Sequence, residues 1–375
     1  MNVHIYPSNF KNESRIEKQA NSISKLNVFK KVLLIGAGAN SSKALSSDTE
    51  IILLGEDNGR ASLVGKIIRF IKWYKAIIFF LKDKEVECIN AHSLSVLPLC
   101  VYLKKVKKAK LVYDTHELET ETNSTAGLKK LLAKKVERLL ISKTDHIFVV
   151  SNSIKNFYQE LYQRSDIDVV LNAPSIKEPL ARNIFRERLG ISEDNLIFLY
   201  QGVLSKGRGI ELLLESFSKI QNKNVSVVFM GYGPLEEVIQ EYQEEYSNIF
   251  HFPAVSPEMV HEHTSSADVG FALIENTCLS YEYCMPNKLF EYGMAGIPCI
   301  VSRLPEMKSY VDTYECGFIL GSQEPAELLR LIDTIMSSNI SVFKENARRG
   351  ALDNNWQEQE KIMLKYYKKE FGRSA

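Results

Sequence analysis

The sequence lacks the usual features of a secreted, disulfide-linked or membrane-spanning protein. Its six cysteines are scattered over 375 residues and form no Cys-x-x-Cys pair, which disfavours a structural zinc site and fits reduced thiols in the cytosol. The first twenty residues contain no apolar core of a secretory signal, and no uninterrupted apolar run approaches the roughly 18 residues of a membrane span. From these absences we expect a cytoplasmic protein.

The composition shows no strong bias, and this excludes several classes of protein. Apolar residues make up 45% and charged residues 25%, values that disfavour a collagen, a coiled coil or a disordered chain. At roughly 100 to 200 residues per domain, the length favours two domains. The net charge is only +1, but residues 1–180 carry 28 Lys and Arg against 19 Asp and Glu, while the remainder carries 19 against 27. The basic first half suggests a surface that faces phosphate groups, an anionic membrane or nucleic acid.

Short apolar runs alternate with longer helical patterns along the whole chain. The expected strands are Val3–Tyr6, Val32–Ile35, Ile51–Leu54, Cys88–Ala91, Leu111–Tyr113, Ile147–Val150 and Val169–Leu171, then Ile197–Tyr200, Val225–Met230, Ile249–Phe252, Val269–Leu273, Cys299–Val301 and Gly317–Leu320. Apolar strands separated by helices predict parallel sheets buried on both faces, and hence an α/β protein with two doubly wound domains. A linker with two prolines, residues 172–182, separates the two series. Because ligands of such sheets bind beyond the carboxyl ends of the strands, we expect the substrates in a central cleft between facing domains.

The most informative segment is Pro286–Ser302, PNKLFEYGMAGIPCIVS, which predicts a loop, a helix that opens at Pro286 or Asn287, and a buried strand. A helix N-terminus favours anions, so Lys288 in the first turn is either part of a phosphate site or an exposed surface lysine. Glu291 lies one turn later, where it either accepts hydrogen bonds from ribose hydroxyls or serves as a plain helix charge.

This segment resembles the donor-binding motif of GT-B-fold retaining glycosyltransferases of family 4 (group 1), in the branch whose motif runs Pro-Asn-Lys-x-x-Glu-Tyr. Further segments resemble other motifs of the family, in the same order along the chain. They are Tyr113–Leu118 at a strand end, Gln201–Ile210 and Met230–Pro234 after two later strands, Ala267–Gly270 before the donor loop, and a final helix that begins at Trp356. The resemblance covers nearly the whole chain and implies a GT-B fold, in which two Rossmann-like domains face a central cleft.

The resemblance also implies a division of labour between the domains. Residues 1–176 are expected to form an acceptor-binding Rossmann-like domain and residues 177–353 a donor-binding one. Residues 354–375 are expected to form a C-terminal helix that crosses back to the first domain. The acceptor-binding residues expected in the first domain are Ser8, Asn9 and Arg15.

The donor site that the resemblance implies is built from glycines, cations and one acid. Gly202 and Gly231 would let the backbone approach the ligand closely, because they lack side chains. Arg208 and Lys288 would bind the diphosphate of a nucleotide-sugar, and Glu291 would hold its ribose. The full set of expected donor-binding residues is Gly202, Arg208, Gly231, Asn287, Lys288, Leu289 and Glu291.

His116 and Glu117 are the expected catalytic residues. The resemblance places His116 near the transferred sugar and its phosphate, and the alternative is a strand-end histidine capped by a neighbour. Glu117 is expected to line the cleft in a role that stays open. Two departures from the family pattern, Tyr283 in place of a glutamate and Val203 in place of an arginine, leave the transferred sugar unassigned.

The implied reaction is the transfer of a sugar from a UDP- or GDP-sugar to a lipid-linked glycan with retention of configuration, in the synthesis of capsule, O-antigen or a related cell-surface polysaccharide of bacteria. The two cations would stabilise the leaving diphosphate, so no metal and no other cofactor is expected. The alternatives are a nucleotide-sugar epimerase of the same fold and a noncatalytic nucleotide-binding partner subunit.

Three basic helical segments of the first half, Lys66–Lys75, Lys104–Lys110 and Lys129–Lys143, predict docking on the anionic inner face of the cell membrane. The alternative is helices packed on the sheet with ordinary lysines outside. No nucleic acid is expected as a partner, because no aromatic or helix-turn-helix reader motif accompanies the charge. The run Ile35–Asn40 suggests a dinucleotide fingerprint, but its third glycine is missing and NAD is not expected.

Overall fold

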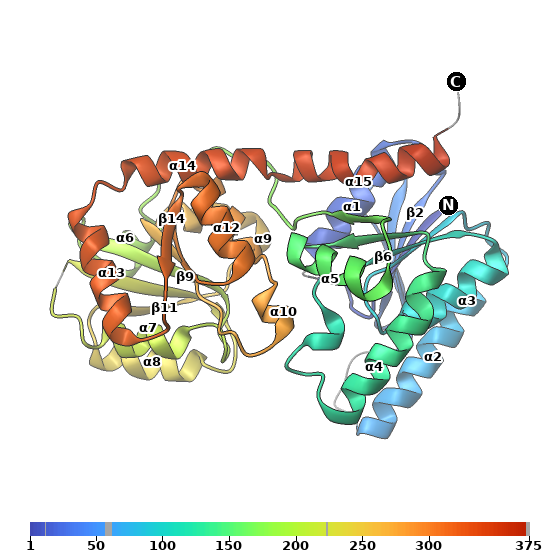
Figure 1. Ribbon diagram of the computed structural model, residues 1–375, viewed down its shortest axis with the longest axis horizontal. Helices are drawn as coiled ribbons and strands as arrows, with labels where there is room; N and C mark the ends of the chain where they lie inside the picture. Colours follow the sequence, from blue (N-terminus) through green and yellow to red (C-terminus); the bar gives the residue numbers. More distant parts are fainter. Residues whose placement is uncertain (12, 57–61, 223, 373–375) are drawn as a thin grey trace. The chain divides into compact units, whose positions relative to one another are not determined.

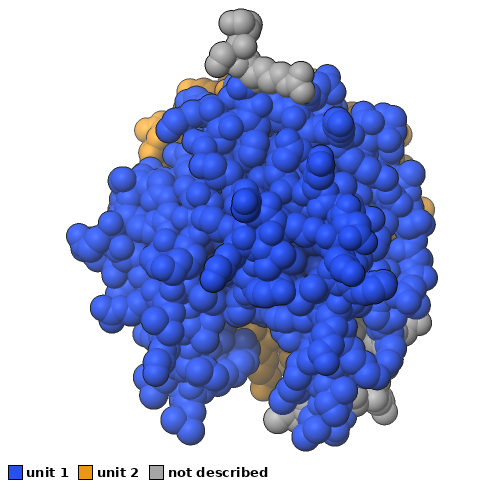
Figure 2. All heavy atoms as spheres, turned by 90° about the vertical axis from the view of Figure 1, so that its right-hand side faces the viewer, with its two compact units in different colours: residues 1–170, 360–375 blue, residues 171–359 orange. Residues whose placement is uncertain are grey.

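The computed structural model describes residues 1–11, 13–56, 62–222 and 224–372. The chain divides into two compact units, of which the first comprises Met1–Val170 with Glu360–Ala375 and the second Leu171–Gln359 (Figure 2). The division at residues 170 and 171 lies a few residues before the border expected at residues 176 and 177. The second division, at residue 359, falls within the last helix of the chain rather than before it.

The first unit is built on a sheet with the strand order β3-β4-β2-β1-β5-β6-β7-β8. Its strands are β1 Asn2–Ile5, β2 Val32–Ala37, β3 Ser41–Ala44, β4 Thr49–Leu54, β5 Cys88–Ala91, β6 Lys110–Asp114, β7 His146–Val149 and β8 Ile167–Val169. All neighbouring strands are parallel except β3 and β4, which are antiparallel. Parallel strands are joined by helices that cover the sheet, which is why most of them are apolar along their whole length.

Helices follow most strands of the first unit (Figure 1). They are α1 Ser14–Lys25, α2 Leu63–Leu81, α3 Leu97–Lys107, α4 Gly127–Leu140 and α5 Asn152–Tyr162, with two 3₁₀ turns at Glu119–Glu121 and Ile141–Lys143. Two helices begin at serine caps, which satisfy backbone N–H groups that have no partner within the helix. The Ser62 hydroxyl accepts from the Gly65 N–H at 3.2 Å, and the Ser151 hydroxyl accepts from the Ile154 N–H at 3.2 Å.

The second unit has an all-parallel sheet with the strand order β11-β10-β9-β12-β13-β14. Its strands are β9 Leu196–Val203, β10 Val225–Tyr232, β11 Ile249–Pro253, β12 Val269–Ala272, β13 Cys299–Ser302 and β14 Gly317–Leu320. Successive residues of one strand enter two different cores: Leu199 packs in one cluster and Tyr200 in the other. Because side chains alternate across a sheet, this pattern shows that β9 is buried on both faces.

The helices of the second unit flank this sheet (Figure 1). They are α6 Ile184–Leu189, α7 Ile210–Phe217, α8 Glu236–Glu245, α9 Pro257–Thr264, α10 Leu279–Glu282, α11 Asn287–Met294, α12 Pro305–Tyr314, α13 Pro325–Ser337 and α14 Ser341–Asp353. The last helix, α15 Trp356–Phe371, begins in the second unit and ends in the first. The Trp356 N–H donates to the Pro174 carbonyl at 2.8 Å, and the Tyr367 hydroxyl donates to Asn90 Oδ1 at 2.5 Å.

The sequence located most strands but missed β3 and misplaced β8. The side chains of Ser41 to Ala44 are all exposed, so β3 has no apolar run for a pattern to detect. It forms because the chain turns back and pairs with β4. Strand β8 lies two residues before its expected position at 169–171. Across the described residues, no helix combines the length and the apolar character needed to cross a membrane.

Candidate functional site

In the second unit, the carboxyl ends of the neighbouring strands β9 and β10 meet at a pair of glycines. Gly202 and Gly231 are register partners. The φ of Gly202 is +122°, a conformation that favours glycine. A Cβ at Gly231 would lie 1.9 Å from the carbonyl oxygen of Gly202, so close packing of the strand ends requires glycine here. The edge of the sheet is therefore bare backbone at this point.

Lys288 lies over this bare edge. It stands in the first turn of α11, which begins at Asn287, as the sequence predicted. Its ammonium lies 3.7 Å from the centroid of the Tyr200 ring, and a Cβ at Gly202 would lie 3.7 Å from the same nitrogen. The charge is thus held between an aromatic face, which attracts cations, and the glycine edge.

A tight loop after β9 places Arg208 in the same region. The loop residues Gly207 and Gly209 have φ values of +80° and +73°, and a Cβ at Gly209 would lie 2.6 Å from Cβ of Leu273. The Arg208 guanidinium lies over the Tyr281 ring, 5.1 Å from its centroid. Its buried Nε has no hydrogen-bond partner among the described residues. A buried donor without a partner costs free energy, so this nitrogen favours an acceptor supplied by a ligand.

The two cations interact unfavourably with each other. Burial, followed by repulsion from Arg208, lowers the pKa of Lys288 to about 7, although Glu291 and Cys284 act in the opposite direction. An anion that pairs with both cations would remove this repulsion and favour the charged lysine. Together with the N-terminus of α11, the arrangement is suited to binding a phosphate or diphosphate.

Glu291 is held in place by a hydrogen-bonded chain from β9. Gln201 Nε2 donates to Glu291 Oε2 at 2.6 Å, and Thr264 Oγ1 donates to Gln201 Oε1 at 2.7 Å. Gln201 is buried and precedes Gly202 in the strand. Sequence analysis quoted Gln201 within a motif but gave it no role. A buried amide at a strand end, directly before a glycine, is the feature that would have indicated one.

Leu289, one of the expected donor-binding residues, lies near the start of α11. Its side chain is 1% exposed and packs in the core of the unit, and its backbone N–H donates to the Pro286 carbonyl at 3.1 Å. Leu289 therefore contributes to the fold of the α11 N-terminus, and its donor-binding role stays a prediction. The side chain of Asn287 is exposed at the start of the helix. Its donor-binding role stays a prediction, as do those of Gly202, Arg208, Gly231, Lys288 and Glu291.

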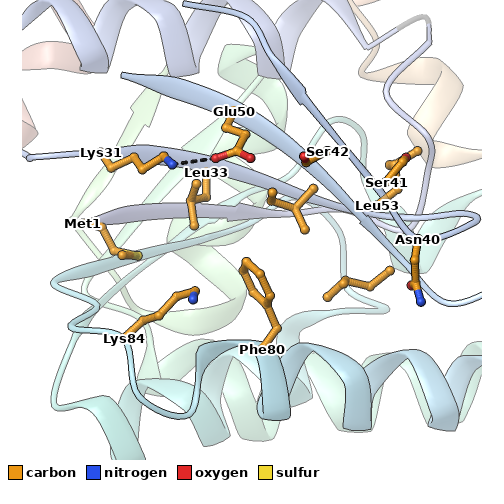
Figure 3. A pocket seen from close by; sticks show the side chains of 12 residues that line it. Met1, Lys31, Leu33, Asn40, Ser41, Ser42, Glu50, Leu53, Phe80 and Lys84 are labelled. Carbon is orange, nitrogen blue, oxygen red and sulfur yellow. Dashed lines mark ion pairs between the residues drawn. The ribbon is translucent and has the colours of Figure 1, made fainter. Parts of the chain in front are cut away.

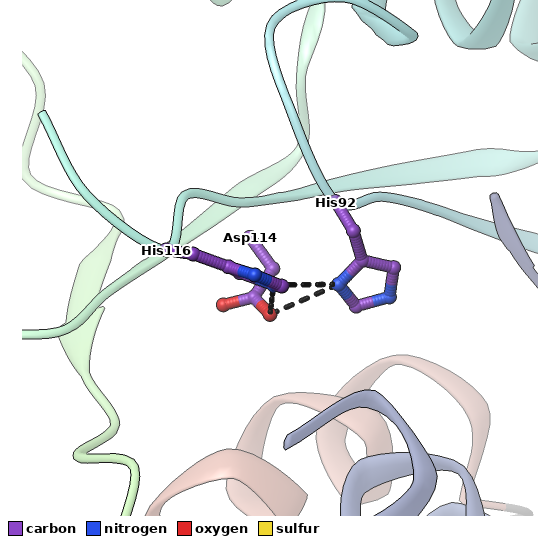
Figure 4. A group of neighbouring side chains, drawn as sticks. All are labelled: His92, Asp114 and His116. Carbon is purple, nitrogen blue, oxygen red and sulfur yellow. Dashed lines mark hydrogen bonds and ion pairs between the residues drawn. The ribbon is translucent and has the colours of Figure 1, made fainter. Parts of the chain in front are cut away.

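In the first unit, His116 belongs to a cluster at the carboxyl ends of β5 and β6 (Figure 4). Asp114 Oδ2 lies 3.0 Å from His92 Nδ1 and 3.3 Å from His116 Nε2. Two residues of α1 complete the shell of the carboxylate. Arg15 donates to both of its oxygens at 2.6 and 3.1 Å, and Gln19 Nε2 donates to Oδ2 at 2.8 Å. His92 follows the end of β5 much as His116 follows the end of β6. This similarity in the sequence would have identified His92 as a further member of the cluster.

The hydrogen bonds fix the tautomers of the histidines. Burial alone would raise the pKa of Asp114, but Arg15, His116 and His92 outweigh it and hold the pKa well below its usual range. The ionised carboxylate only accepts hydrogen bonds, so the His92 Nδ1 and His116 Nε2 that face it carry protons. A neutral His116 then has its lone pair on Nδ1.

The imidazole of His4 contacts His92 at the ring nitrogen that does not face Asp114. His4 Nδ1 lies 2.8 Å from His92 Nε2 and donates to it, because His92 uses its other nitrogen as a donor. Burial lowers the pKa of His92 to about 4 and that of His4 well below its usual value, so both rings are neutral at pH 7. His4 and His92 are thus fully buried, whereas the side chain of His116 at the outer end of the cluster is partly exposed.

The ligand atoms of His92, Asp114 and His116 all lie within 4.8 Å of one another, a grouping compatible with a metal ion. The carboxylate, however, already accepts hydrogen bonds from Arg15 and Gln19. A metal at this place would stand next to the Arg15 guanidinium and compete with these donors. The chemistry of the donor set thus favours a hydrogen-bonded cluster, and the absence of a metal requirement stays a prediction.

The acids near His116 differ in their surroundings. Glu117 is exposed, and its backbone carbonyl accepts from the Thr115 hydroxyl. Sequence analysis missed Glu119, which accepts from the Leu94 N–H at 2.7 Å and whose pKa is raised well above its usual range by burial. The Tyr6 ring lies beside His116, with 5.5 Å between the ring centroids. The catalytic roles of His116 and Glu117 stay predictions.

The residues expected to bind the acceptor have different surroundings. Ser8 Oγ accepts from the Phe10 N–H and Asn9 Oδ1 from the Lys11 N–H, both at 3.1 Å, so both side chains shape the loop after β1. Arg15 is only 4% exposed, and besides Asp114 it donates to the Val170 carbonyl at 2.7 Å. Its guanidinium is buried in these bonds and thereby positions Asp114, and the acceptor-binding roles of Ser8, Asn9 and Arg15 stay predictions.

A cavity of about 620 Å³ lies against the edge strands β3 and β4 of the first unit (Figure 3). It is lined by Met1 before β1, by Lys31 and Glu50, which form an ion pair, by Phe80 of α2 and by Lys84 after that helix. None of the residues expected to bind donor or acceptor lines it.

A family model and a curated protein are each similar in sequence to part of this chain. Residues 181–351, which lie in the second unit, match the family model of glycosyl transferases group 1. The lipopolysaccharide 1,2-N-acetylglucosaminetransferase of Salmonella typhimurium is 30% identical over 132 residues, which cover 33% of this chain and 34% of that protein. The match thus spans about a third of the length of this curated relative.

Two solved structures resemble almost the whole chain. Sucrose-phosphate synthase from Thermosynechococcus elongatus has a TM-score of 0.83 at 16% identity and covers 99% of each chain. Anabaena Alr3699/HepE in complex with UDP and glucose has a TM-score of 0.74 at 12% identity and covers 97% of this chain and 98% of that chain. The chain has the GT-B fold. At these identities the likeness establishes the fold and leaves the activity to other arguments.

The lowered pKa of Lys288 makes a prediction about stability. Between pH 7 and its ordinary value near 10.5, the unfolded chain holds the Lys288 proton and the folded GT-B protein does not, so this group makes stability rise with pH. We expect Lys288→Met to unfold at a higher temperature than the unchanged protein at pH 6. The corresponding difference in the free energy of unfolding between the two proteins should shrink by up to about 1.4 kcal/mol per pH unit above pH 7. Thermal unfolding without ligand, repeated from pH 6 to 9.5, measures it.

The matched control is Lys206→Met, which removes an exposed lysine from the neighbouring loop. Its effect on the unfolding temperature should not vary with pH. A pH-independent difference for Lys288→Met would contradict the unfavourable placement of the Lys288 charge.

Proposed function

We propose that this protein is a retaining glycosyltransferase that transfers a sugar from a UDP- or GDP-sugar to a lipid-linked glycan. The observation that carries the proposal is the pair of cations, Arg208 and Lys288, at the glycine edge of β9 and β10. This site lies within the residues that match glycosyl transferases group 1. The match to a lipopolysaccharide N-acetylglucosaminetransferase supports a role in O-antigen, capsule or related cell-surface polysaccharide synthesis.

The proposed chemistry uses the charges of the protein itself. Arg208 and Lys288 bind the diphosphate and stabilise the negative charge that develops on it as the sugar leaves, so no metal is required. The helix N-terminus at Asn287 adds to this stabilisation, and Glu291 holds the ribose. The sugar retains its configuration if the acceptor hydroxyl attacks it from the side on which the phosphate departs. The departing phosphate then helps to accept the proton of that hydroxyl.

His116 orients the reacting sugar in this proposal. Its Nε2–H is held by Asp114, so its Nδ1 is free to accept a hydrogen bond from a sugar hydroxyl. Arg15, Gln19 and His92 fix the carboxylate in turn and thereby fix the ring. A rigid acceptor at this position favours one orientation of the bound sugar over others.

The first unit has a surface suited to an anionic membrane. Four leucines of α4 are exposed, with Leu128 at 85%, and Phe79 of α2 is 80% exposed. The other exposed leucines of α4 are Leu131, Leu132 and Leu139. Exposed lysines of α4 accompany them, including Lys129 and Lys135. Apolar residues and lysines on one helix are typical of interfacial docking, which a lipid-linked acceptor requires.

Nucleotide binding is the first test of the proposal. We expect UDP or GDP to raise the unfolding temperature of the protein, while ADP, CMP and NAD leave it unchanged. A nucleotide at 100 times its Kd adds about 2.7 kcal/mol to the stability of the folded protein. Lys288→Ala should abolish the shift, and Lys219→Ala, an exposed lysine of the same unit, should retain it. A shift with NAD alone, or with no nucleotide, would overturn the proposal.

His116 is tested by turnover. Release of UDP or GDP from the matching nucleotide-sugar should fall by about 10²- to 10⁴-fold in His116→Ala, because the reacting sugar is no longer oriented. The nucleotide-induced thermal shift should persist, because the diphosphate site is intact. His261→Ala is the control and should turn over normally. Interconversion of the sugar without nucleotide release would favour an epimerase, and binding without turnover a noncatalytic subunit.

Membrane docking is tested with vesicles. Lys130 and Lys134 pair with Glu121, so the informative charges on α4 are Lys129 and Lys135. Reversal of both to Glu should weaken binding to phosphatidylglycerol vesicles by at least about tenfold, because each charge near an anionic surface contributes about 1 kcal/mol. The same reversal at Lys365 and Lys369 of α15 is the control. Equal sedimentation of all three proteins would contradict docking through α4.

A further inference from the structure

Gln201, near the carboxyl end of β9, is hydrogen-bonded to two successive residues of α11. Its side chain is 3% exposed, and its amide nitrogen donates to Glu291 Oε2 at 2.6 Å. Its backbone N–H donates to the Tyr292 hydroxyl at 3.3 Å. That hydroxyl lies 3.1 and 3.0 Å from the carbonyl oxygens of Leu199 and Phe271, to one of which it donates. The helix is therefore tied to the sheet at Gln201 through both neighbouring side chains.

The Tyr292 ring fixes the backbone of α11 against the sheet. The ring is fully buried, and a Cβ at Gly270 of β12 would lie 2.4 Å from its Cδ2. The strand and the ring can thus approach each other only because residue 270 is glycine. Glu291 precedes Tyr292 in the helix, so its Cα is fixed as well. The direction of its carboxylate is a separate matter, because the last torsion of a glutamate side chain is broad.

Thr264, the last residue of α9, sets the direction of the Gln201 amide. Its side chain is fully buried, and its Oγ1 lies 2.7 Å from both Gln201 Oε1 and the Val260 carbonyl oxygen. The hydroxyl has one proton to donate. The Val260 carbonyl lies within a helix, where a backbone N–H four residues later supplies a donor. Gln201 Oε1 has no other donor among the described residues, so the proton belongs to it.

The hydrogen-bonded chain from Thr264 through Gln201 ends on the group proposed to hold the ribose. With its oxygen turned to Thr264, the Gln201 amide presents its nitrogen to Glu291. The 2′- and 3′-hydroxyls of a ribose are neighbouring donors at a fixed spacing, so they match a carboxylate in only a few of its orientations. A carboxylate that is oriented before the ligand arrives loses less entropy on binding.

We infer that Gln201 and Thr264 are positioning residues that give the donor site its selectivity for an intact ribose over a deoxyribose. The inference rests on the proposed function, in which Glu291 holds the ribose, and adds the residues that set this selectivity. Thr264 acts through Gln201, and Gln201 acts through Glu291. A site built to pair with a hydroxyl rejects an analogue that lacks it, because a polar group of the protein is then left unpaired.

Two nucleotides that differ only in the ribose hydroxyls measure this selectivity. We would determine by calorimetry the Kd of UDP or GDP, whichever raises the unfolding temperature, and the Kd of its 2′,3′-dideoxy form. The dideoxy form should bind the unchanged protein at least about tenfold more weakly, because it lacks the hydrogen bonds to the carboxylate. The ratio of the two Kd values is the readout. Damage to the diphosphate site weakens both nucleotides alike and leaves this ratio unchanged.

Two variants interrupt the chain with little change in shape. Gln201→Met removes the amide, and Thr264→Val removes the hydroxyl. Each should lower the ratio at least about threefold, because the carboxylate is no longer held before the ligand arrives. Thr264→Ser keeps the hydroxyl and should keep the ratio. The matched control is Thr334→Val on α13, which also removes a hydroxyl that donates to the carbonyl four residues earlier and should have no effect.

The variant that carries both Gln201→Met and Thr264→Val tests whether Thr264 acts through Gln201. Its ratio should equal that of Gln201→Met alone, because contacts within one chain are not additive. This double variant also avoids the buried amide oxygen that Thr264→Val alone leaves without a donor, so it keeps the test open if that single variant folds poorly. A further fall of the ratio in the double variant would contradict the order of the chain.

Three results would overturn the inference and leave the donor site standing. They are equal Kd values for the two nucleotides in the unchanged protein, an unchanged ratio in Gln201→Met or Thr264→Val, and a loss in Thr264→Ser or Thr334→Val as large as that in Thr264→Val. Failure of every nucleotide to bind would overturn the proposed function together with the inference. The two kinds of failure are therefore distinguishable.

Discussion

Two like charges held close together, those of Lys288 and Arg208, are the constraint on which the second unit's site depends. Their repulsion and burial oppose the charged state of Lys288. The fold nevertheless maintains the arrangement through the Tyr200 ring, the left-handed glycines around Arg208 and the start of α11. Such an arrangement is suited to an anion, because an anion that pairs with both cations converts their repulsion into two attractions.

The first unit is organised around the opposite charge. The buried carboxylate of Asp114 is balanced by Arg15 and hydrogen-bonded by Gln19, His92 and His116. A buried carboxylate without partners is strongly unfavourable, so Asp114 holds each of these donors in place. One consequence is that three neighbouring imidazoles differ in character, with two buried rings kept neutral and one at the outer end.

Sequence reasoning succeeded where local pattern decides structure. Apolar runs located most strands, and the motif around Lys288 located the helix start at Asn287. It could not give a residue's surroundings where these come from distant segments. Leu289 lies inside the donor motif yet packs in the core, and Arg15 lies after the acceptor loop yet binds Asp114, 99 positions away. Gly36, part of an apparent dinucleotide fingerprint, is required because a Cβ there would lie 2.3 Å from the Ser8 carbonyl oxygen.

The sequence by itself determined the α/β class, the parallel order of short apolar strands, the glycines at strand ends and the cation at the start of α11. These properties follow from hydrophobic periodicity and local backbone chemistry, which act over a few residues. Only the tertiary structure decided that His4 and His92 lie next to each other beside His116, and that Gln201 holds Glu291. Such groupings depend on which strand ends become neighbours, and strand order is set by packing of the whole sheet.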